Sequence, residues 1–517
     1  MSEPKRRPVL YPFLAGAFSV LYLWSTNLEQ DVSAPEALRW LAISVAGTGV
    51  VFFAFRALFK DGHRAGIAAT ALAAAFFSYG YALRSIETSV RRDVSSSLLI
   101  AWLLMACAGV LLAVRARRWA PRATPSLNLV AAVLVLLNAV PIAIHQFTPA
   151  SQAAGTSNGP LLLPGIDASA AGERRDVYYI ILDRYANVKT LDEQFSFDDA
   201  PFLDFLQGEG FYVARDSLAN YPKTTHSLAS TLNMTFLDRL GARMGPNSGD
   251  WQPLYDMLRG FDVERAFTGL GYRTEHIGSW WTPTSVDPYA DANHVYGGTA
   301  EFSHVFLSTT MWPKVSEAVG LVPYVSFERQ QYERVLYQFR ELDRIAEDPR
   351  PTFTFAHFTL PHPPYVFDAQ GNFVPPGVAA QGDPDREYLE QLQYTNDRVE
   401  QLVTKLTAGP DDEDPIIVIQ SDEGPHPYAL EHDEDHYDFT KAPLSDLQRK
   451  LRILNAYYLP GIDETGLYPS ITPVNSFRLI FHDYFGADLP LLPDRTWIYQ
   501  DVRHPYRFTE VTDELKT

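Results

Sequence analysis

Five apolar stretches occupy the first 150 residues, and they constrain the fold more than any other feature of the chain. They lie at about residues 9–27, 38–59, 67–86, 96–114 and 126–147. A helix that crosses a bilayer needs roughly 20 apolar residues. Buried helices of a soluble protein would be the alternative, but five such stretches in succession argue against it. The sequence therefore predicts a transmembrane domain of about five helices over residues 1–147.

Basic residues between these stretches predict the orientation in the membrane. Most of them fall on one side: Lys5, Arg6, Arg7, Arg56, Lys60, Arg64, Arg115, Arg117, Arg118 and Arg122. Three others fall on the opposite side: Arg84, Arg91 and Arg92. By the positive-inside rule the amino terminus is cytoplasmic, and the chain emerges outside after the fifth span. We therefore expect an integral protein of the cell (inner) membrane with an extracytoplasmic C-terminal domain.

Charge divides the chain into two parts. The first 150 residues hold 14 Lys and Arg against 7 Asp and Glu, and the remainder holds 29 against 55. Such an acidic domain argues against nucleic acid as a partner, because nucleic-acid surfaces select basic proteins. The single cysteine, Cys107, lies in an apolar stretch and provides neither a disulfide nor a thiol site in the acidic part. Residues 148–173 have the composition of a linker, which leaves 174–517 as the second domain.

Two apolar runs that end in carboxylates indicate where a site would lie in the second domain. Residues 176–183, DVYYIILD, read as a strand buried on both faces that ends at Asp183. A second run, PIIVIQSDEG, ends at Asp422 and Glu423. Ligands bind at the carboxyl edge of open α/β sheets, where both runs would place their acids. The two acids would then meet at one edge of a parallel sheet.

Short apolar runs alternate with amphipathic stretches through the second domain, which predicts an α/β fold with a mostly parallel central sheet. The expected strands are 176–182, 271–278, 352–360, 416–420 and 454–460. The expected helices are 199–208, 225–238, 253–269, 327–347, 386–407 and 474–485.

A hydroxyl-rich segment, YPKTTHSLAS, places Thr224 at the start of a predicted helix with Ser227 three residues on. A helix amino terminus suits an anionic phosphate or sulfate, although an ordinary N-cap explains the same pattern. A threonine hydroxyl is a weak nucleophile until a base or metal lowers its pKa. Asp183 and Asp422 offer the oxygen ligands that Mg, Mn, Ca or Zn accept.

The order of these segments carries a family resemblance. A strand ending in a carboxylate is followed by T-x-x-S, then by PHPPY at 361–365, and then by a strand ending in S-D-x-G. This set resembles the alkaline-phosphatase/sulfatase superfamily. With membrane spans ahead of it, the layout is similar to lipoteichoic acid synthases and phosphoethanolamine transferases. The resemblance implies a sulfatase-like α/β/α domain and a metal-dependent hydrolase or transferase that acts on phospho- or sulfo-esters.

The resemblance also implies roles for individual residues. Asp183 and Asp422 correspond to metal ligands, and Thr224 to a ligand that is also the nucleophile. His362 corresponds to a histidine that contacts the transferred group or the leaving group. His357 is a second candidate for substrate contact, with a core histidine on a strand as its alternative.

Two positions depart from the family pattern. Glu423 stands where relatives usually have His, and as a third carboxylate near Asp183 and Asp422 it would favour Mn, Mg or Ca, with Zn possible. Alternatively, it marks a site that has lost its metal. Arg184 would either clamp an anionic substrate or pair with Glu423. Thr225 is the alternative nucleophile if the register shifts by one. Three histidines that follow the motif are candidates to compensate: His426, His432 and His436.

The subtype and the partners follow from the same comparison. Sulfatases proper form their nucleophile from Cys or Ser in C/S-x-P-x-R, which is matched here only by residues 2–6 at the cytoplasmic end. A threonine nucleophile instead favours phosphoryl-type chemistry on membrane lipids, lipid-linked substrates, or envelope glycans and polymers. An inactive relative that binds those molecules is one alternative. A transporter is another, but the spans carry few ionisable residues.

Overall fold

The computed structural model describes residues 8–30, 32–90, 94–147, 159–166, 174–297, 301–319, 325–376, 382–410, 414–462 and 466–516. The chain forms two compact units. The membrane unit comprises Met1–Ser151 and Thr299–Phe327, and the α/β unit comprises Gln152–Gly298 and Glu328–Thr517. Most of the expected linker, 148–173, lies outside the described residues.

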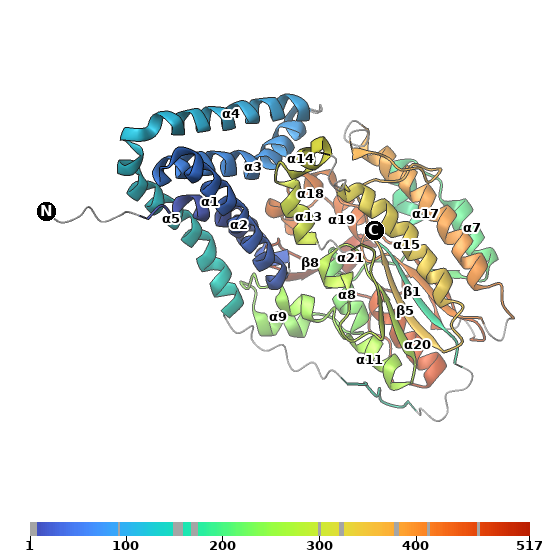
Figure 1. Ribbon diagram of the computed structural model, residues 1–517. Helices are drawn as coiled ribbons and strands as arrows, with labels where there is room; N and C mark the ends of the chain where they lie inside the picture. The colour runs from blue at the N-terminus through green and yellow to red at the C-terminus, as the bar shows by residue number, and fades with distance from the viewer. Residues whose placement is uncertain are drawn as a thin grey trace. The chain divides into compact units, whose positions relative to one another are not determined.

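Five helices form the amino-terminal part of the membrane unit (Figure 1): α1 Tyr11–Thr26, α2 Ala34–Phe59, α3 Gly62–Val90, α4 Ser95–Arg115 and α5 Ala120–Phe147. Four of them, α2 to α5, are long and apolar enough to cross a bilayer, and the chain is an integral membrane protein. By this criterion the described residues contain four membrane-capable helices, against the five that the sequence predicts. The reason is that α1 has only 16 residues, about 24 Å of helix against a hydrocarbon core of ~30 Å.

Helix α1 nevertheless packs along the bundle. At its start, the Tyr11 N–H donates to Asn128 Oδ1 of α5 at 3.0 Å, and Tyr11 Oη donates to the His63 carbonyl at 3.2 Å. At its end, Ser25 Oγ donates to Asn138 Oδ1, further along α5, at 2.5 Å. Helices α1 and α5 therefore run side by side in the same direction, as the first and fifth helices of an up-and-down bundle do.

A segment from the second half of the chain belongs to the membrane unit. Its helices are α13 Glu301–Ser308 and α14 Trp312–Val319. Trp40 Nε1 of α2 donates to Ser303 Oγ at 2.6 Å, and the Gly80 N–H of α3 donates to the Thr309 carbonyl at 2.9 Å. The sequence had placed this segment within 174–517, without any sign that it contacts the spans.

The α/β unit is built on a seven-stranded sheet of order β2-β7-β6-β1-β5-β3-β4. The strands are β1 Val177–Leu182, β2 Tyr212–Val213, β3 Arg273–Ile277, β4 Ala292–His294, β5 Thr352–Phe358, β6 Ile416–Gln420 and β7 Asn455–Tyr458. Strand β1 pairs in parallel with β5 and β6, and β7 is antiparallel to β6. The predicted α/β fold with a mostly parallel sheet is confirmed.

Alternate residues of β1 pack into two separate hydrophobic cores, one on each face of the sheet. The domain therefore has three layers, with helices on both sides of the sheet (Figure 1). Tyr179 points to one face and Ile180 to the other. The first face is covered by α8 Thr224–Leu232, α10 Gln252–Asp256, α11 Asp262–Gly269 and α20 Ser476–Phe485. The second is covered by α7 Ala200–Gly208, α15 Phe327–Ile345 and α17 Pro384–Leu406. Burial on both faces explains why the strands read as continuous apolar runs.

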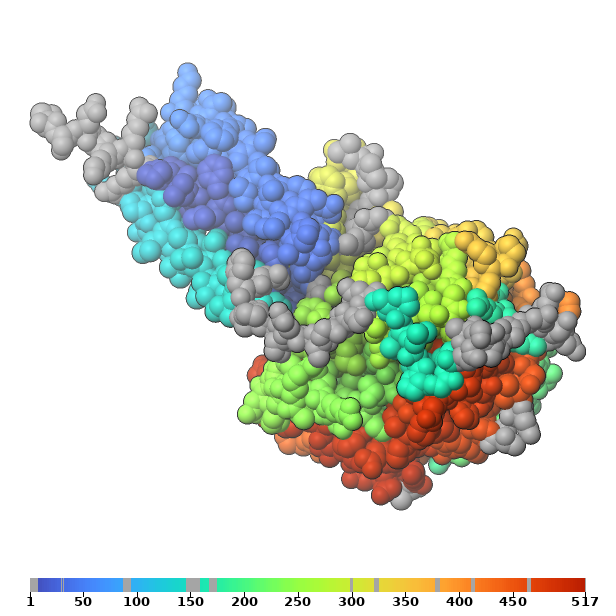
Figure 2. All heavy atoms as spheres, turned by 90° about the horizontal axis from the view of Figure 1, so that it is seen from below, coloured from blue at the N-terminus to red at the C-terminus, as the bar shows by residue number. Residues whose placement is uncertain are grey.

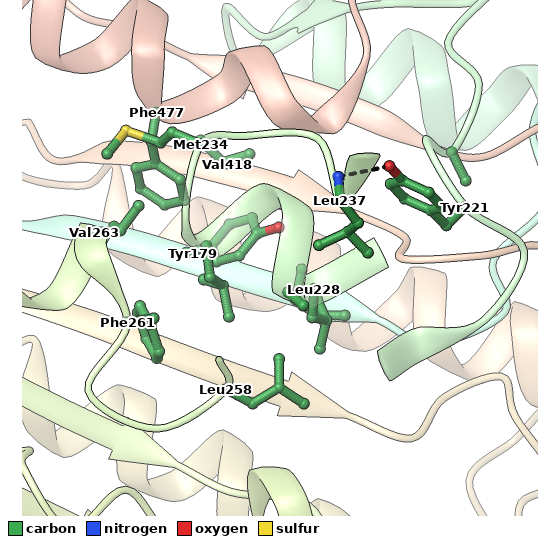
Figure 3. Packing of buried hydrophobic residues seen from close by; sticks show 14 of the residues in the cluster. Tyr179, Tyr221, Leu228, Met234, Leu237, Leu258, Phe261, Val263, Val418 and Phe477 are labelled. Carbon is green, nitrogen blue, oxygen red and sulfur yellow. Dashed lines mark hydrogen bonds between the residues drawn. The ribbon is translucent and has the colours of Figure 1, made fainter. Parts of the chain in front are cut away.

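The first core holds α8 against the sheet (Figure 3). Leu228 of α8 packs in one cluster with Tyr179 of β1 and Phe477 of α20. Behind α8, the Leu237 N–H donates to Tyr221 Oη at 2.8 Å, which fixes the loops on both sides of the helix. This packing sets the position of the amino end of α8, where Thr224 lies.

The C-terminal hairpin closes over the same face. It consists of β8 Trp497–Tyr499 and β9 Phe508–Glu510. Trp251 Nε1 donates to the Val502 carbonyl at 2.9 Å, and Tyr506 Oη donates to the Asp250 carbonyl at 2.6 Å. In Figure 2 green and red parts of the chain lie next to each other on one surface of the α/β unit.

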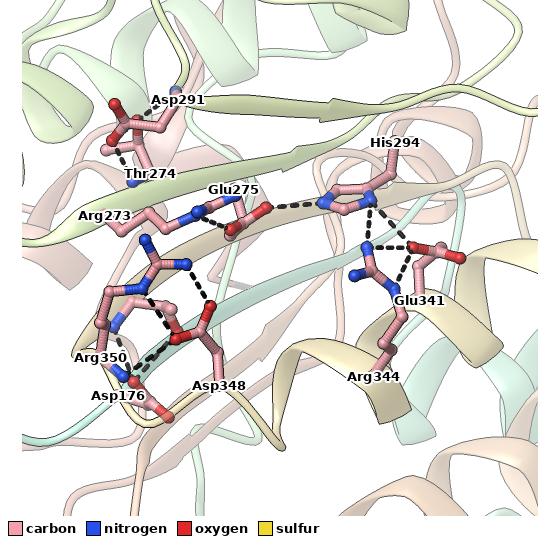
Figure 4. A network of polar contacts seen from close by, with 11 residues as sticks. Asp176, Arg273, Thr274, Glu275, Asp291, His294, Glu341, Arg344, Asp348 and Arg350 are labelled. Atoms are coloured by element: carbon pink, nitrogen blue, oxygen red, sulfur yellow. Dashed lines mark hydrogen bonds and ion pairs between the residues drawn. The ribbon is translucent and has the colours of Figure 1, made fainter.

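A separate polar network ties strands together apart from the carboxyl ends of β6, β1 and β5 (Figure 4). Asp176, just before β1, accepts hydrogen bonds from the N–H and hydroxyl of Thr352 at 2.7 and 3.0 Å. His294 of β4 bridges Glu275 at 2.6 Å and Glu341 of α15 at 2.9 Å. The network fixes the central and edge strands, and the carboxyl ends of β6, β1 and β5 remain for the site.

Candidate active site

Three side chains converge at the carboxyl ends of the adjacent strands β6, β1 and β5. Asp183 follows β1 and Asp422 follows β6, while His357 lies in β5 opposite Ile181 of β1. One ligand atom from each of Asp183, His357 and Asp422 lies within 4.8 Å of the other two. Two carboxylates and one imidazole at such distances form a cluster capable of binding a metal ion.

The polar atoms of this cluster are buried without hydrogen-bond partners. They are Asp183 Oδ1, both carboxylate oxygens of Asp422, and His357 Nε2. Burial and the Glu423 charge raise the pKa of Asp183 to about 7, and burial with the Asp183 charge raises the pKa of Asp422 well above its usual range. Unpaired buried acids are costly, and a divalent cation would satisfy them. The residues therefore fit a metal ion.

His357 is oriented as a ligand would be. Its Nδ1 is 2.8 Å from Thr284 Oγ1, and its Nε2 lies 3.6 Å from Asp183 Oδ2. If Nδ1–H donates to Thr284, the lone pair of Nε2 faces the two aspartates, as in metal sites whose histidines are held by an outer partner. Burial lowers the pKa of His357 to about 4, despite the opposing charge of Asp422, so the ring is neutral at physiological pH.

Thr224 lies beside the cluster at the amino terminus of α8. Lys223 precedes it with extended backbone, as an N-cap residue does. Burial and the charges of Asp183 and Glu423 raise the pKa of Asp422, and the nearby Thr224 side chain lowers it by a smaller amount. Thr224 is half-buried, whereas Thr225 is fully buried. The geometry brings Thr224, and not Thr225, to an accessible position near the carboxylates.

Glu423 contacts protein cations through one of its oxygens. Its Oε1 lies 2.5 Å from Lys450 Nζ, 3.5 Å from Arg184 Nε and 3.6 Å from His426 Nε2. Burial would raise the pKa of Glu423, but Lys450 and Arg184 outweigh it and lower the pKa. Glu423 is not among the three residues whose ligand atoms converge, although its Oε2 is buried without a partner.

Arg184 occupies a strained position next to Asp183. Its φ of 66° is in the left-handed region that non-glycine residues rarely adopt. The buried guanidinium donates to Glu431 Oε2 at 3.0 Å and also approaches Glu423. Both expectations for Arg184 remain compatible with this geometry, because it is paired with Glu423 and also lies at the edge of the cluster.

The other predicted histidines divide into two groups. His362 is held by its N–H donating to the Asp183 carbonyl at 3.2 Å, and its Nδ1 contacts the Pro363 carbonyl. Burial and the Arg184 charge lower the pKa of His362 well below its usual range. His426 pairs with Glu431 at 2.9 Å near Glu423. His432 and His436 are exposed, make other contacts and lie outside the cluster of metal-ligand candidates.

Sequence reasoning missed two of these features. Lys450 lies at the carboxyl end of α19 Leu444–Leu451, far along the chain from Glu423, and no motif marks it. His357 was expected to contact substrate, whereas its imidazole lies among the convergent ligand atoms. Its position in register with Ile181, at the end of the strand next to Asp183, follows only from the sheet order.

Two acids and an imidazole lie together at the carboxyl edge of a mostly parallel α/β sheet, beside a threonine at a helix amino terminus. Residues 185–463 match the profile of the family described as Sulfatase. The chain therefore belongs to the sulfatase family, within the alkaline-phosphatase/sulfatase superfamily. A search of curated proteins finds no significant match.

Solved structures show distant similarity. The C-terminal periplasmic domain of EcEptC from Escherichia coli is 14% identical, with a TM-score of 0.42, over 68% of this chain and 97% of that one. The integral membrane lipooligosaccharide phosphoethanolamine transferase A from Neisseria meningitidis is 11% identical, with a TM-score of 0.37, over 91% and 94%. The PsFucS1 sulfatase from Pseudoalteromonas sp. is 16% identical, with a TM-score of 0.41, over 65% and 76%.

Proposed function

We propose that the protein is a membrane-anchored, metal-dependent transferase or hydrolase that acts through Thr224 on phospho- or sulfo-esters of envelope lipids or glycans. The observation that carries the proposal is the convergence of buried, unpartnered ligand atoms from Asp183, His357 and Asp422 beside the accessible Thr224. Membership of the sulfatase family supports the class of reaction.

The donor set supports a particular choice of cation. With Glu423 held by Lys450, the convergent ligands are two carboxylates and an imidazole. Imidazole suits Zn, whereas carboxylates alone favour Mg, Ca or Mn. The sequence expectation of Mn, Mg or Ca, with Zn possible, depends on Glu423 as a ligand; without Glu423 the donor set supports Mn or Zn over Mg or Ca.

The residues divide the chemistry between them. A bound divalent cation would supply positive charge that neutralises an ester oxygen and acidifies the threonine hydroxyl. Thr224 Oγ1 would form a bond to phosphorus or sulfur as the bond to the leaving oxygen breaks, while its hydroxyl proton is directed at Asp422. The amino end of α8 would receive the anionic group.

His362 suits the second half of such a reaction. Its Nδ1 is engaged by the Pro363 carbonyl, and burial keeps the ring neutral. Its Nε2 would then accept the proton of the water or acceptor hydroxyl that releases the group from Thr224. Arg184, already at the edge of the cluster, would contact the anionic oxygens.

The nucleophile is tested with two neighbouring threonines. Thr224→Ala should lower turnover of a chromogenic phosphodiester by roughly 10³-fold or more, as removal of a nucleophile does. Thr225→Val, which keeps the volume of a fully buried side chain, should retain turnover. The test measures turnover of each variant as full-length protein in detergent and determines its metal content in parallel. Equal activity of Thr224→Ala with metal still bound would refute the assignment.

The inactive alternative has a specific observation in its favour. Glu423, at the position where the family resemblance implies a histidine, is buried and paired with Lys450. If the site is inactive, the wild-type protein and Thr224→Ala will show the same background turnover of phosphodiester and sulfate ester substrates with every divalent cation added. Binding of envelope glycans or lipids would then be the remaining function.

A further inference from the structure

The membrane unit contains an apolar cavity that the chemistry above does not use. Its volume is about 570 Å³, and it lies between α2, α3 and α4 with α13 and α14 as one wall. Small residues form much of its lining, among them Gly47 of α2, Ala69 and Ala73 of α3, and Ala106 of α4. Phe306, on α13, contributes a larger apolar side chain. Every element of the cavity belongs to the membrane unit.

The dimensions of the cavity match a lipid tail. Along α2 the lining extends from Trp40 to Val51, which is ~17 Å of helix and about half of the ~30 Å hydrocarbon core. A Cβ built on Gly47 meets no atom within 4 Å, so the cavity is open at this point. Ile43 and Leu103 line the cavity and are also 49% exposed, which places its margin against the surrounding bilayer.

We propose that this cavity binds one acyl chain of a glycerophospholipid from the leaflet on the α13 side. An apolar space of this size offers water few hydrogen-bond partners, and the medium around α2, α3 and α4 is lipid. An acyl chain in the cavity would make van der Waals contacts with the side chains that line it, which lack protein neighbours on that side. The proposal that the cavity binds a lipid depends only on observations in the membrane unit. A role for that lipid as donor or acceptor rests on the proposed function.

Two arginines flank α13 and would contact the phosphate of such a lipid; one carboxylate, Glu36, also accepts from the Ser303 N–H at 2.9 Å. Arg39 of α2 donates to Ser303 Oγ at 3.2 Å, and Arg84 of α3 donates to Ser308 Oγ at 3.3 Å. Both serines belong to α13, so the two guanidinium groups flank the same helix. Arg84 violates the positive-inside pattern of the sequence, and a phosphate partner gives a reason for its position.

Two tryptophans reinforce the assignment of this end of the cavity to the membrane interface. Trp40 and Trp312 both line the cavity, and Trp40 also donates a hydrogen bond to Ser303. Tryptophan is enriched where headgroups meet hydrocarbon, because its ring is apolar and its N–H is polar. The segment 301–319 would thus contact both the tail and the headgroup region of one bound lipid.

Photolabelling tests this site in the full-length protein. The protein is reconstituted in phosphatidylcholine vesicles containing phosphatidylglycerol with a diazirine at the end of one acyl chain. After illumination, labelled peptides are located by mass spectrometry. Gly47→Leu fills the cavity without a clash, and Val50→Leu is its matched control, because Val50 is 70% exposed on the same helix.

We expect label on α2, α3 and α13–α14 in the wild-type protein, and an about tenfold loss of this label in Gly47→Leu but not in Val50→Leu. The double variant Arg39→Gln/Arg84→Gln should reduce labelling by phosphatidylglycerol but not by a diazirine diacylglycerol, which lacks the phosphate. Equal labelling of Gly47→Leu and Val50→Leu would overturn the proposal. Labelling does not depend on catalysis, so an inactive Thr224 leaves the result unchanged.

Discussion

Lys450 Nζ lies 2.5 Å from Glu423 Oε1, and both side chains are buried. A lysine thus neutralises the carboxylate that replaces the histidine of the family motif. Because Arg184 also approaches Glu423, the charge of this carboxylate is offset by the protein itself. The imidazole among the convergent ligand atoms is that of His357, which lies in β5, next to β1.

Removing one partner of this buried pair should destabilise the protein strongly. Lys450→Met leaves the Glu423 charge with Arg184 as its nearest cation, and we expect a loss of about 3–5 kcal/mol in the free energy of unfolding. The double variant Lys450→Met/Glu423→Leu should recover most of that loss, because it removes both charges. Unfolding followed by tryptophan fluorescence in detergent measures the effect. A double variant no more stable than Lys450→Met would contradict it.

Thr284 should control metal affinity through His357. Thr284→Val keeps the shape of the side chain but removes the hydroxyl that contacts His357 Nδ1. Loss of such an outer partner typically weakens metal binding about 10- to 100-fold. Titration of metal-free protein with Zn²⁺ and Mn²⁺ measures the affinity. Ser285→Ala is the control, because Ser285 Oγ donates only to the nearby Thr282 carbonyl; an equal effect of both variants would disprove the role.

Asp199 should make stability depend on pH. Tyr185 Oη donates to its Oδ2 at 3.0 Å and Asn396 Nδ2 to its Oδ1 at 2.8 Å, yet burial raises its pKa to about 7. A raised pKa in the folded state means that the stabilising contribution is complete below about pH 4 and is lost as the pH rises through about 7. Tyr185 follows Arg184, so this network also supports the loop beside the site.

Asp199→Asn removes this titration. Relative to wild type, the variant should gain stability as the pH rises from about 4 to 7, by up to about 4 kcal/mol. The gain is measured from unfolding midpoints across that range. The exposed neighbour variant Asp198→Asn should follow the wild-type profile. A constant difference between Asp199→Asn and wild type at every pH would show that Asp199 does not titrate in this range.

Topology depends on whether the short helix α1 crosses the membrane. Its contacts with Asn128 and Asn138 run along α5, so we expect five crossings and termini on opposite sides. A fluorescent protein fused before Met1 should fluoresce, and an alkaline phosphatase fused after Thr517 should be active in the extracytoplasmic space. If both reporters indicate the same side, α1 does not cross and only the four longer helices span.

The central strands could be predicted because their burial leaves a direct trace in the sequence. β1 and β6 are unbroken apolar runs, and the acids that end them are visible as interruptions of those runs. The N-terminal position of Thr224 follows from local helix patterning in the same way. These features depend on residues close together in the chain, which is the range over which sequence patterns carry information.

The rest depends on contacts between distant segments. The register of His357 with Ile181 is set by strand order, and Lys450 approaches Glu423 only because α19 returns to the sheet edge. The attachment of α13 to α2 and α3 is likewise invisible in composition, because residues 301–319 resemble any amphipathic helical segment. The contact of Glu423 with Lys450, on which a metal preference drawn from Glu423 depends, is likewise invisible in the sequence.

The central claim is that Asp183, His357 and Asp422 bind one divalent cation beside Thr224. Metal analysis of full-length protein purified without chelator tests it, with His357→Ala and Asp422→Ala compared against His362→Ala. The account predicts a stoichiometric divalent ion in wild type and in His362→Ala, and its loss from the other two variants. A metal-free wild-type protein that takes up no divalent ion on titration, or undiminished metal in His357→Ala and Asp422→Ala, would contradict it.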